Sequence, residues 1–476
     1  MADALARNQP RHELTQLLVD ARPVCHPTAG QRGIGRYTIG LLAGLHQIGA
    51  PVIGLYETVD EHVQLAIALP DLPLRELNPA TVREYTQPGA WYVATQLMLH
   101  PIPLDPVPRI ITESGLPVAA VMYDVIPERY PEQYQVRPVA RAQVQLRGML
   151  TRTLDTLLAI SDFAADTAAE ELRFPRGRIT TIGAGCDERF TRSTSDAWPR
   201  LRRVVHKDNR ALVINVAGGS DPRKNVGGLL RAWGLLPAAV RRSHRLVVVG
   251  TYDNALHAQW LRWASEAGVV DDVVFTGSVT DDELVALHQV AKLAVVPATE
   301  EGFGLPVLEA AACGCPVLTS NLSALPEVLA EPAAQFDPFD TSSISDALAR
   351  ALTDAQHREV LAAAARRAVE RWTWANTAHA VVNSLEQLGP RKHRTLRPVR
   401  ERIAITGCFD DSPLGRSNAE HAQKMRDRYE VTILVDNGAN NDTPTHAGPL
   451  RFPARALDRY VHRSQFDEIL TLPVQP

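Results

Sequence analysis

Short apolar runs alternate with longer stretches of helical periodicity along most of the chain. Residues 17–19, 118–122 and 157–160 are apolar runs of strand length, and a helix-period stretch follows the first and the third. Ser161 stands where the third run gives way to a helix, a position at which serine caps free N–H groups. Strands and helices that recur in this order predict βαβ units on a parallel sheet.

A second series of the same kind occupies the middle of the chain, after a polar, basic stretch at residues 193–209. We expect strands at residues 212–216, 246–249, 273–275, 293–296 and 316–318, and helices at residues 226–233, 307–313 and within 342–388. The prediction is an α/β protein with two Rossmann-like parallel-sheet domains, at residues 1–200 and 201–371, and a further helix at residues 372–390.

The last part of the chain begins a third series. Residues 391–401 read as a linker, whose basic charge suits either a solvated connector or a patch on a membrane surface. A strand at residues 402–407, a loop containing Gly415 and a strand at residues 431–435 repeat the plan of residues 14–55. Residues 402–476 are therefore predicted to form a partial third Rossmann-like unit.

Composition narrows the class of protein. The chain has 50 Lys plus Arg against 54 Asp plus Glu, which argues against a dedicated nucleic-acid binder. Its five cysteines are scattered and odd in number, so they predict reduced thiols and a cytoplasmic location rather than a disulfide framework. Neither a signal-peptide core nor an apolar run near the ~20 residues of a membrane span is present. The sequence contains no cluster of cysteines and histidines with the spacing of metal ligands, so we expect no metal site.

The segment with the most specific chemistry is Glu301-Gly-Phe-Gly-Leu-Pro-Val-Leu-Glu309. Its two carboxylates flank a glycine-rich turn, and we expect the second in the first turn of a helix. Gly302 and Gly304 permit close backbone approach, and Pro306 suits a helix start. The N–H groups of that helix start favour anions, and carboxylates accept hydrogen bonds from sugar hydroxyls. The alternative is an ordinary capped helix with surface acids.

Two further loops follow expected strands. Residues 218–225 carry Arg223 and Lys224, adjacent cations that suit a diphosphate leaving group; the alternative is a helix start with solvated cations. The first strand leads to a loop that contains Gly33 and Gly35, with its helix expected from Tyr37. Glycines in such a loop also serve turns alone.

The segment that follows residues 118–122 is Tyr123-Asp124-Val125-Ile126-Pro127. Asp124 is a candidate cleft residue because it stands at the carboxyl end of an expected strand. The alternative is a plain acid at a helix start, where a negative charge is favourable.

The segment from Glu301 to Glu309 resembles the E-x7-E motif of the retaining GT-B glycosyltransferases, family four of the sequence classification. The lead-in at residues 296–300 and the continuation at residues 310–317 match that family as well. The resemblance implies that Glu309 binds the ribose hydroxyls of the donor and that Glu301 contacts its sugar. It also implies backbone contacts to donor sugar and phosphate from Phe303, Gly304 and Leu305.

The other loops resemble the family less closely. Lys224 occupies the place of the family's phosphate-binding lysine, whereas Gly219 replaces its usual arginine, for which Arg223 is the candidate substitute. Gly277 belongs to a segment that resembles the loop touching the nucleotide base. Tyr123 stands where most members have a histidine that helps to bind the reacting sugar, so the resemblance does not extend to that contact.

Three segments extend the resemblance. Residues 32–38, with Gly33 and Gly35, are similar to mannosyltransferase-like members acting on bacterial surface polysaccharide, and this loop closes over the diphosphate or lines the acceptor site in the family. Trp374 resembles the start of the helix that crosses back to the first domain. Residues 402–476 resemble the start of a second, tandem glycosyltransferase without an E-x7-E motif of its own, either a truncated or a degenerate module.

The resemblance implies a metal-independent, retaining hexosyltransferase with an acceptor-side domain at residues 1–200 and a nucleotide-sugar domain at residues 201–371. GDP-mannose is the first expectation for the donor, and a glycan, lipid-linked or small-molecule hydroxyl is the acceptor. Front-face transfer would use Arg223 and Lys224 to stabilise the leaving diphosphate, with Asp124 and Glu301 in the same site. We expect a cytoplasmic protein or one held at the inner membrane face. The alternatives are an inactive partner protein and a sugar-nucleotide epimerase.

Overall fold

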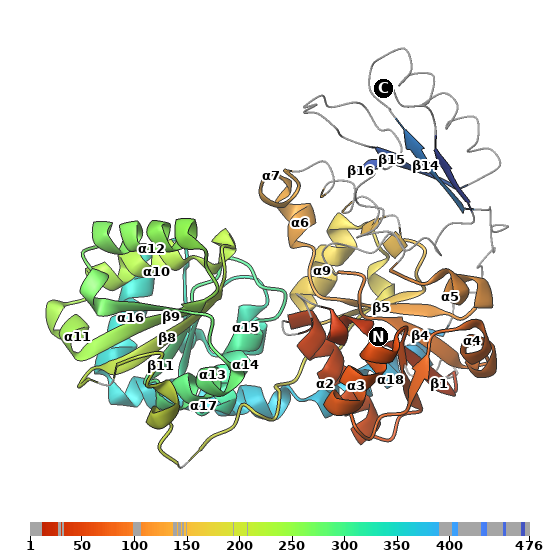
Figure 1. The fold of residues 1–476 in the computed structure, drawn as a ribbon. Coiled ribbons are helices and arrows are strands. Elements are labelled where there is room, and N and C mark those ends of the chain that lie inside the picture. Colours follow the sequence, from red (N-terminus) through yellow and green to blue (C-terminus); the bar gives the residue numbers. More distant parts are fainter. Residues whose placement is uncertain are drawn as a thin grey trace.

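The computed structural model describes residues 12–389 and four strands beyond them, of which only the backbone is described (Figure 1). Within 12–389 the description omits residues 27–29, 31–32, 99–105, 137–139, 141–143, 145–146, 149, 194 and 207. Two α/β domains lie side by side, and the chain passes from the first to the second and back again (Figure 1).

The first domain is built on a seven-stranded parallel sheet in the order β3-β2-β1-β4-β5-β6-β7. Its strands are β1 (Gln16–Asp20), β2 (Val52–Tyr56), β3 (Leu74–Glu76), β4 (Ala90–Ala94), β5 (Val118–Met122), β6 (Thr156–Ala159) and β7 (Ile179–Thr181). Every residue of β4, β5 and β6 is buried, which explains why these strands read as unbroken apolar runs. Its helices are α2 (Gly33–Gln47), α3 (Val59–Ala68), α4 (Pro79–Tyr85), α5 (Arg109–Ser114), α6 (Ile126–Arg129), α7 (Pro131–Tyr134), α9 (Asp162–Glu171) and the short 3₁₀ helices η2 (Arg22–Cys25) and η3 (Arg176–Arg178). The 3₁₀ helix η4 (Trp198–Leu201) packs against α13 (Asp281–Val290) of the second domain.

The second domain has a six-stranded parallel sheet in the order β10-β9-β8-β11-β12-β13. Its strands are β8 (Ala211–Gly218), β9 (His244–Gly250), β10 (Val273–Gly277), β11 (Leu293–Val296), β12 (Val317–Ser320) and β13 (Gln335–Phe336). Helices α10 and α12 lie on one side of the sheet, and α13, α14 and α17 on the other (Figure 1). The helices are η5 (Pro222–Lys224), α10 (Val226–Leu235), α11 (Ala238–Ser243), α12 (Asn254–Glu266), η6 (Val270–Asp272), α13 (Asp281–Val290), α14 (Leu305–Ala312), α15 (Leu325–Val328), η7 (Pro332–Ala334), α16 (Thr341–Thr353) and α17 (Ala355–Arg371).

Strand order reverses once in each sheet, between β1 and β4 in the first and between β8 and β11 in the second. In doubly wound sheets, ligands bind at the carboxyl ends of the strands where this reversal opens a crevice. In the second domain, residues 219–225 follow β8 and residues 297–304 follow β11. The topology therefore brings the two loops with the clearest sequence chemistry to one place.

The last helix within residues 12–389, α18 (Trp374–Leu388), packs against α2 and so returns the chain to the first domain (Figure 1). Gly40 and Gly44 leave a flat surface on α2 for Trp374, since a Cβ atom at either glycine would fall 2.0 to 2.4 Å from an atom of that tryptophan. The segment that leaves the first domain after β7 contacts the segment that returns to it before α18, at two points. Gly183 lies against Trp372, and Gly185 against Trp374.

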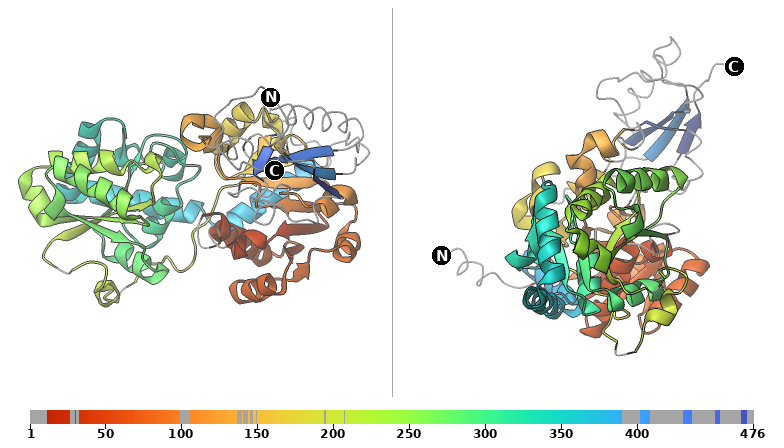
Figure 2. Two further views of the ribbon diagram at one scale, coloured as in Figure 1. Left: turned by 45° about the horizontal axis from the view of Figure 1, so that its top comes forward. Right: turned by 90° about the vertical axis from the view of Figure 1, so that its left-hand side faces the viewer.

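A separate four-stranded parallel sheet follows, with the order β16-β15-β14-β17. Its strands are β14 (Arg402–Gly407), β15 (Glu430–Val435), β16 (Arg451–Pro453) and β17 (Glu468–Thr471), drawn in blue in Figures 1 and 2. The order matches that of β3-β2-β1-β4 at the start of the first domain. The linker at residues 391–401, Gly415 and Cys408 lie outside the described residues.

Most expected elements agree with the structure, and Ser161 caps α9 as predicted, accepting a hydrogen bond from the N–H of Ala164. Two details of the sequence analysis were wrong. Gly33 and Gly35 are not in a loop, because α2 already begins at Gly33. Glu309 lies in the second turn of α14 rather than the first, because that helix begins at Leu305.

Candidate donor-binding site

The loop after β8 turns sharply and presents two cations. Gly218 adopts a left-handed conformation with φ of 75°, and η5 then starts at Pro222. Asp221 caps this turn by accepting the N–H of Arg223 at 3.2 Å, and its second carboxylate oxygen holds Arg223 Nε at 2.8 Å. The guanidinium of Arg223 is thereby folded back and aimed towards the loop after β11.

Glu301 is where the two loops meet. Arg223 Nη1 lies 2.9 Å from Glu301 Oε2, and Lys224 Nζ donates to Glu301 Oε1. Burial opposes ionisation of this carboxyl, but the charges of Lys224 and Arg223 outweigh it and hold the pKa of Glu301 at about 2. The structure therefore brings together Glu301, Arg223 and Lys224, three residues that the sequence placed in two separate motifs.

The turn into α14 depends on its glycines and its proline. Gly304 has φ of 105°, a conformation that favours glycine, and Pro306 stands in the first turn of the helix. Gly302 has no room for a side chain, since a Cβ atom there would lie 2.2 Å from the backbone oxygen of Tyr123. The turn thus lies directly against the end of β5. Phe303 is buried beside Trp372 (ring centroids 5.1 Å apart), and Leu305 starts the helix.

Glu309 lies deeper along α14 and has a different electrostatic environment. Its side chain is 13% exposed, and Arg36 Nη1 approaches Glu309 Oε1 at 3.5 Å. Burial raises the pKa of Glu309 to about 7; the Arg36 charge opposes that rise and the charges of Asp281 and Asp187 add to it. Arg36 also pairs with Asp281 at the start of α13.

Arg36 is a site residue that the sequence analysis did not single out. It extends from α2 of the first domain to two carboxylates of the second. Arg189, from the segment between the domains, pairs with the same Asp281. The only sequence signal for Arg36 was its place directly after Gly35.

Asp124 performs the helix-start role that the sequence left as an alternative, because its Oδ1 accepts the N–H of Ile126 at 3.1 Å. It also lies at the domain boundary, where a Cβ atom on Gly302 would be 3.1 Å from Asp124 Cβ. Tyr123 is buried, its ring lying edge-on to Tyr37 with centroids 5.2 Å apart. Burial raises the pKa of Tyr123, and a hydrogen bond with Thr38 opposes that rise.

The remaining predicted glycines fall into two groups. Gly219 lies beside Thr251, whose hydroxyl hydrogen-bonds Ser278 at 2.8 Å next to Gly277, so these two loops are neighbours. Gly277 adopts φ of 72° near the Tyr252 ring. A Cβ atom on Gly35 would be 2.2 Å from the backbone oxygen of Gly30, whereas one on Gly33 would have no described atom within 4 Å.

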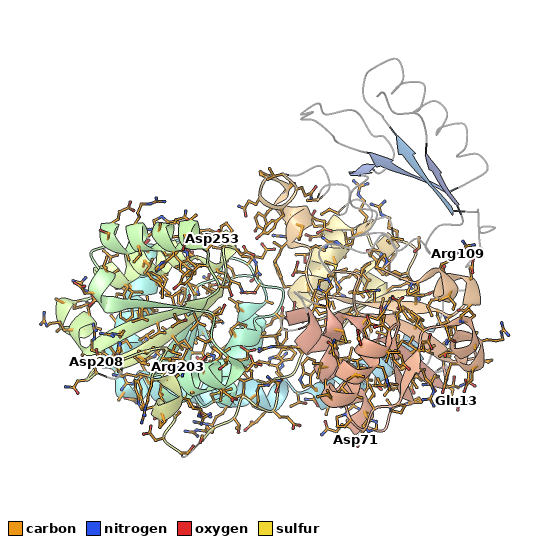
Figure 3. All side chains as sticks on the ribbon, viewed as in Figure 1. Glu13, Asp71, Arg109, Arg203, Asp208 and Asp253 are labelled. Atoms are coloured by element: carbon orange, nitrogen blue, oxygen red, sulfur yellow. The ribbon has the colours of Figure 1, made fainter. Side chains whose placement is uncertain are left out.

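A second set of cross-domain contacts comes from α6 and α7. Tyr130 donates a hydrogen bond to Glu300, and Arg129 Nε lies 2.9 Å from the same carboxylate. Tyr134 donates to Asp221 at 2.6 Å. Figure 3 shows side chains of the two domains meeting along this boundary. Sequence reasoning missed these residues, because nothing in the local pattern indicates their partners.

In the part of the chain that the structure describes, no cluster of three or more His, Cys, Asp or Glu side chains is arranged to hold a metal ion. Within the same residues, no helix combines the length and the apolar character needed to span a bilayer.

Residues 199–368 match the family model for glycosyl transferases group 1. Serotype-specific mannosyltransferase WbdA of Escherichia coli is 32% identical over 292 residues, a match that covers 60% of this chain and 34% of WbdA. O-antigen chain mannosyltransferase B of Escherichia coli is 31% identical over 236 residues, covering 49% of this chain and 60% of that relative. The chain therefore spans only part of the length of these relatives.

Solved structures share the fold at low sequence identity. Anabaena HepE in complex with UDP and glucose aligns with a TM-score of 0.58 at 16% identity, over 78% of this chain and 99% of that one. WaaG, a glycosyltransferase involved in lipopolysaccharide biosynthesis, aligns with a TM-score of 0.54 at 16% identity over the same shares. The predicted two-domain GT-B fold is confirmed. Residues 199–368 are a glycosyl transferases group 1 domain, which forms the second half of that fold.

Proposed function

We propose that this chain is a retaining glycosyltransferase that moves a hexose from a nucleoside diphosphate sugar to a hydroxyl of a glycan acceptor. The observation that carries the proposal is the cluster of Arg223, Lys224 and Glu301 at the strand-order reversal of the second sheet. Two cations and a carboxylate, beside the start of α14, match the chemistry of a diphosphate attached to a sugar.

Within the protein, Glu301 pairs with both Arg223 and Lys224, and Asp221 pairs with Arg223, so two carboxylates balance the two cations. A bound diphosphate would take over these cations and release the Glu301 carboxylate to accept hydrogen bonds from sugar hydroxyls. The same cations then stabilise the charge that develops on the diphosphate as the glycosidic bond breaks. The acceptor oxygen attacks from the side that the diphosphate leaves, and a phosphate oxygen takes its proton.

Glu309 and Arg36 supply the second half of the donor site in this proposal. The Glu309 carboxylate accepts hydrogen bonds from the ribose hydroxyls of the donor. Without a donor, its ion-pair partner is Arg36. The loop with Gly277 receives the base. Protein cations, not a metal ion, neutralise the diphosphate, so transfer is expected to persist in EDTA.

The mannosyltransferase relatives favour mannose as the sugar and GDP-mannose as the donor. Their names connect one of them to O-antigen chains, which supports a growing surface polysaccharide as the acceptor and synthesis in the cytoplasm or at the inner membrane face. The four-stranded sheet at residues 402–471 repeats the strand order of β3-β2-β1-β4, which supports a second glycosyltransferase-like module beginning there.

A panel of nucleotide sugars tests the proposal in two steps. Thermal unfolding identifies the donor, because a ligand that binds only the folded state raises its midpoint. Product analysis with that donor and an oligomannose acceptor then detects transfer, with Glu301→Gln as the inactive control. A panel in which no nucleotide sugar stabilises the protein contradicts the proposal.

A second candidate, a partner protein that binds donor without transferring it, is favoured by one observation. Tyr123 stands where related enzymes have a histidine, and its side chain is buried against Tyr37, so no imidazole is offered to the reacting sugar. Donor binding without any transferred sugar, over a range of oligosaccharide acceptors, would support this second function.

A further inference from the structure

The segment formed by α6 and α7, residues 126–134, connects the first domain to the donor site of the second. We call it the docking hairpin. It leaves the first sheet directly after Asp124, and three of its side chains reach across the domain boundary: Arg129, Tyr130 and Tyr134.

Tyr134 reaches the donor cluster through Asp221. Its hydroxyl donates to Asp221 Oδ1 at 2.6 Å, and Asp221 Oδ2 holds Arg223 Nε at 2.8 Å. The other end of the guanidinium, Arg223 Nη1, donates to Glu301 Oε2 at 2.9 Å. An unbroken chain of hydrogen bonds therefore runs from the first domain to the carboxylate that faces the proposed donor sugar.

Tyr130 and Arg129 hold the neighbouring residue, Glu300. The Tyr130 hydroxyl donates to one Glu300 carboxylate oxygen, and Arg129 Nε lies 2.9 Å from the other. The Glu300 side chain is 4% exposed. Its backbone oxygen accepts Arg223 Nη1 at 2.8 Å, so the hairpin contacts the side chain of Glu300 and the donor cluster contacts its backbone.

The docking hairpin is itself fixed to the first domain. Glu128 forms a buried ion pair with Arg147. Gln135 Nε2 donates to the backbone oxygen of Pro127 at 2.7 Å, which closes the hairpin on itself. The docking hairpin is therefore attached to the first domain by contacts of its own, besides those that it makes with Asp221 and Glu300.

We propose that Tyr130, Tyr134 and Arg129 are positioning residues of the donor site, which orient Arg223 and Glu301 when the two domains are closed. This inference rests on the proposed function. Asp221 and Glu300 are flexible carboxylates, and a neutral donor from the opposite domain fixes each in the orientation that serves Arg223. Arg223 is then oriented towards the diphosphate only when the hairpin contacts the second domain. Domain closure and catalytic competence are therefore coupled.

Hydrogen exchange tests the coupling without any ligand. The N–H of Thr299 bonds to the backbone oxygen of Arg223, and that of Glu301 to Ser323 Oγ. In Tyr134→Phe we expect both amides to exchange about tenfold faster, the scale of losing one hydrogen bond to a charged group. Tyr85→Phe, in α4, is the matched control. Equal exchange in the two variants would overturn the proposal.

Donor kinetics with GDP-mannose test the same chain by a double-mutant cycle. Tyr134→Phe and Asp221→Asn should each lower kcat/KM about tenfold, and the double variant should lose little more than either, because both break one chain. A merely structural role predicts multiplying losses, which would refute the coupling.

Asp208 provides the matched control for Asp221. It accepts the N–H of Arg210 at 2.9 Å and holds Arg210 Nε at 2.9 Å, the same two contacts, but it lies on the outer surface of the second domain (Figure 3). Asp208→Asn should leave kcat/KM unchanged. If the wild type transfers no sugar, the proposed function fails, while the exchange experiment still decides the role of the hairpin.

Discussion

The carboxyls of Glu301 and Glu309, at the two ends of one motif, have pKa values displaced in opposite directions, to about 2 and about 7. Both side chains are largely buried, and burial by itself favours the protonated form of each. The difference arises because Glu301 has both Arg223 and Lys224 within contact, whereas Glu309 has Arg36 at 3.5 Å and acidic neighbours.

Neutral variants of the two acids should therefore change stability with opposite signs. Glu301 has a folded-state pKa below the ordinary 4.5, so its charge stabilises the fold above that pH, and the contribution is lost as the pH falls towards 2. At pH 8, Glu301→Gln should lower the free energy of unfolding by about 1–3 kcal/mol. Urea denaturation at pH 8 measures it.

Glu309 has a folded-state pKa above 4.5, so its ionisation costs stability as the pH rises from 4.5 to about 7. At pH 8, Glu309→Gln should raise the free energy of unfolding by about 1–3 kcal/mol, and at pH 4.5 the gain should vanish. Destabilisation by Glu309→Gln at pH 8 would contradict the assigned electrostatics.

Nucleotide binding should weaken below neutral pH. Glu309 is largely protonated below pH 7 in the free protein, and a protonated carboxyl is a poorer acceptor for ribose hydroxyls. Between pH 8 and pH 6 the Kd for GDP should rise by about three- to tenfold. Calorimetry at several pH values measures this, and the Glu309→Gln variant should show a flat profile. A flat profile in the wild-type protein would rule out Glu309 as the titrating ligand.

Removing Arg36 should move that profile upwards in pH. The Arg36 guanidinium lowers the pKa of Glu309, so Arg36→Ala should leave Glu309 protonated at higher pH than in the wild type. The midpoint of the GDP-binding profile should shift accordingly. Arg83→Ala, an exposed arginine of α4, is the control and should leave the midpoint in place. An unchanged midpoint in Arg36→Ala would mean that the cross-domain contact is not maintained in solution.

The crossing between Gly183 and Trp372 should not tolerate a side chain. Gly183 has φ of 75°, and a Cβ atom there would lie 2.7 Å from the Trp372 ring. Gly49 has nearly the same φ, 73°, but open space around it. In urea denaturation, Gly49→Ala should cost about 1–2 kcal/mol for backbone strain alone, and Gly183→Ala about 1–3 kcal/mol more for overpacking. Equal losses of unfolding free energy in the two variants would show that the Trp372 ring moves aside without cost.

The sequence predicted those parts of the fold that local pattern determines. Apolar runs located β1, β5 and β6 of the first sheet and β8 to β12 of the second, because parallel strands covered on both faces must be apolar throughout. The short strands β3, β7 and β13 have no such run and were not predicted. The start of α2 was misplaced because Gly33 and Gly35 have low helix propensity. The structure explains Gly35, which packs directly on the Gly30 backbone, where a side chain has no space.

The site was predictable only within each motif. Arg223, Lys224 and Glu301 were found from their own loops, since the charges and glycines stand next to one another in sequence. The contact of Arg36 with Glu309 joins residues 273 positions apart, and that of Tyr134 with Asp221 joins residues 87 apart. Both depend on how the two domains close, which no local periodicity encodes.

The docking of Trp374 on Gly40 and Gly44 has a consequence for the order of assembly. A ribosome produces the first domain's seven strands long before it reaches residues 374–388, yet the surface of α2 that those glycines keep flat is covered only by that late helix. The nascent first domain must therefore wait, incompletely covered, for the whole second domain to emerge. In a chain that ends before Trp374, the surface of α2 that α18 normally covers would stay exposed on an otherwise folded first domain. Chaperones and proteases would recognise that exposed surface.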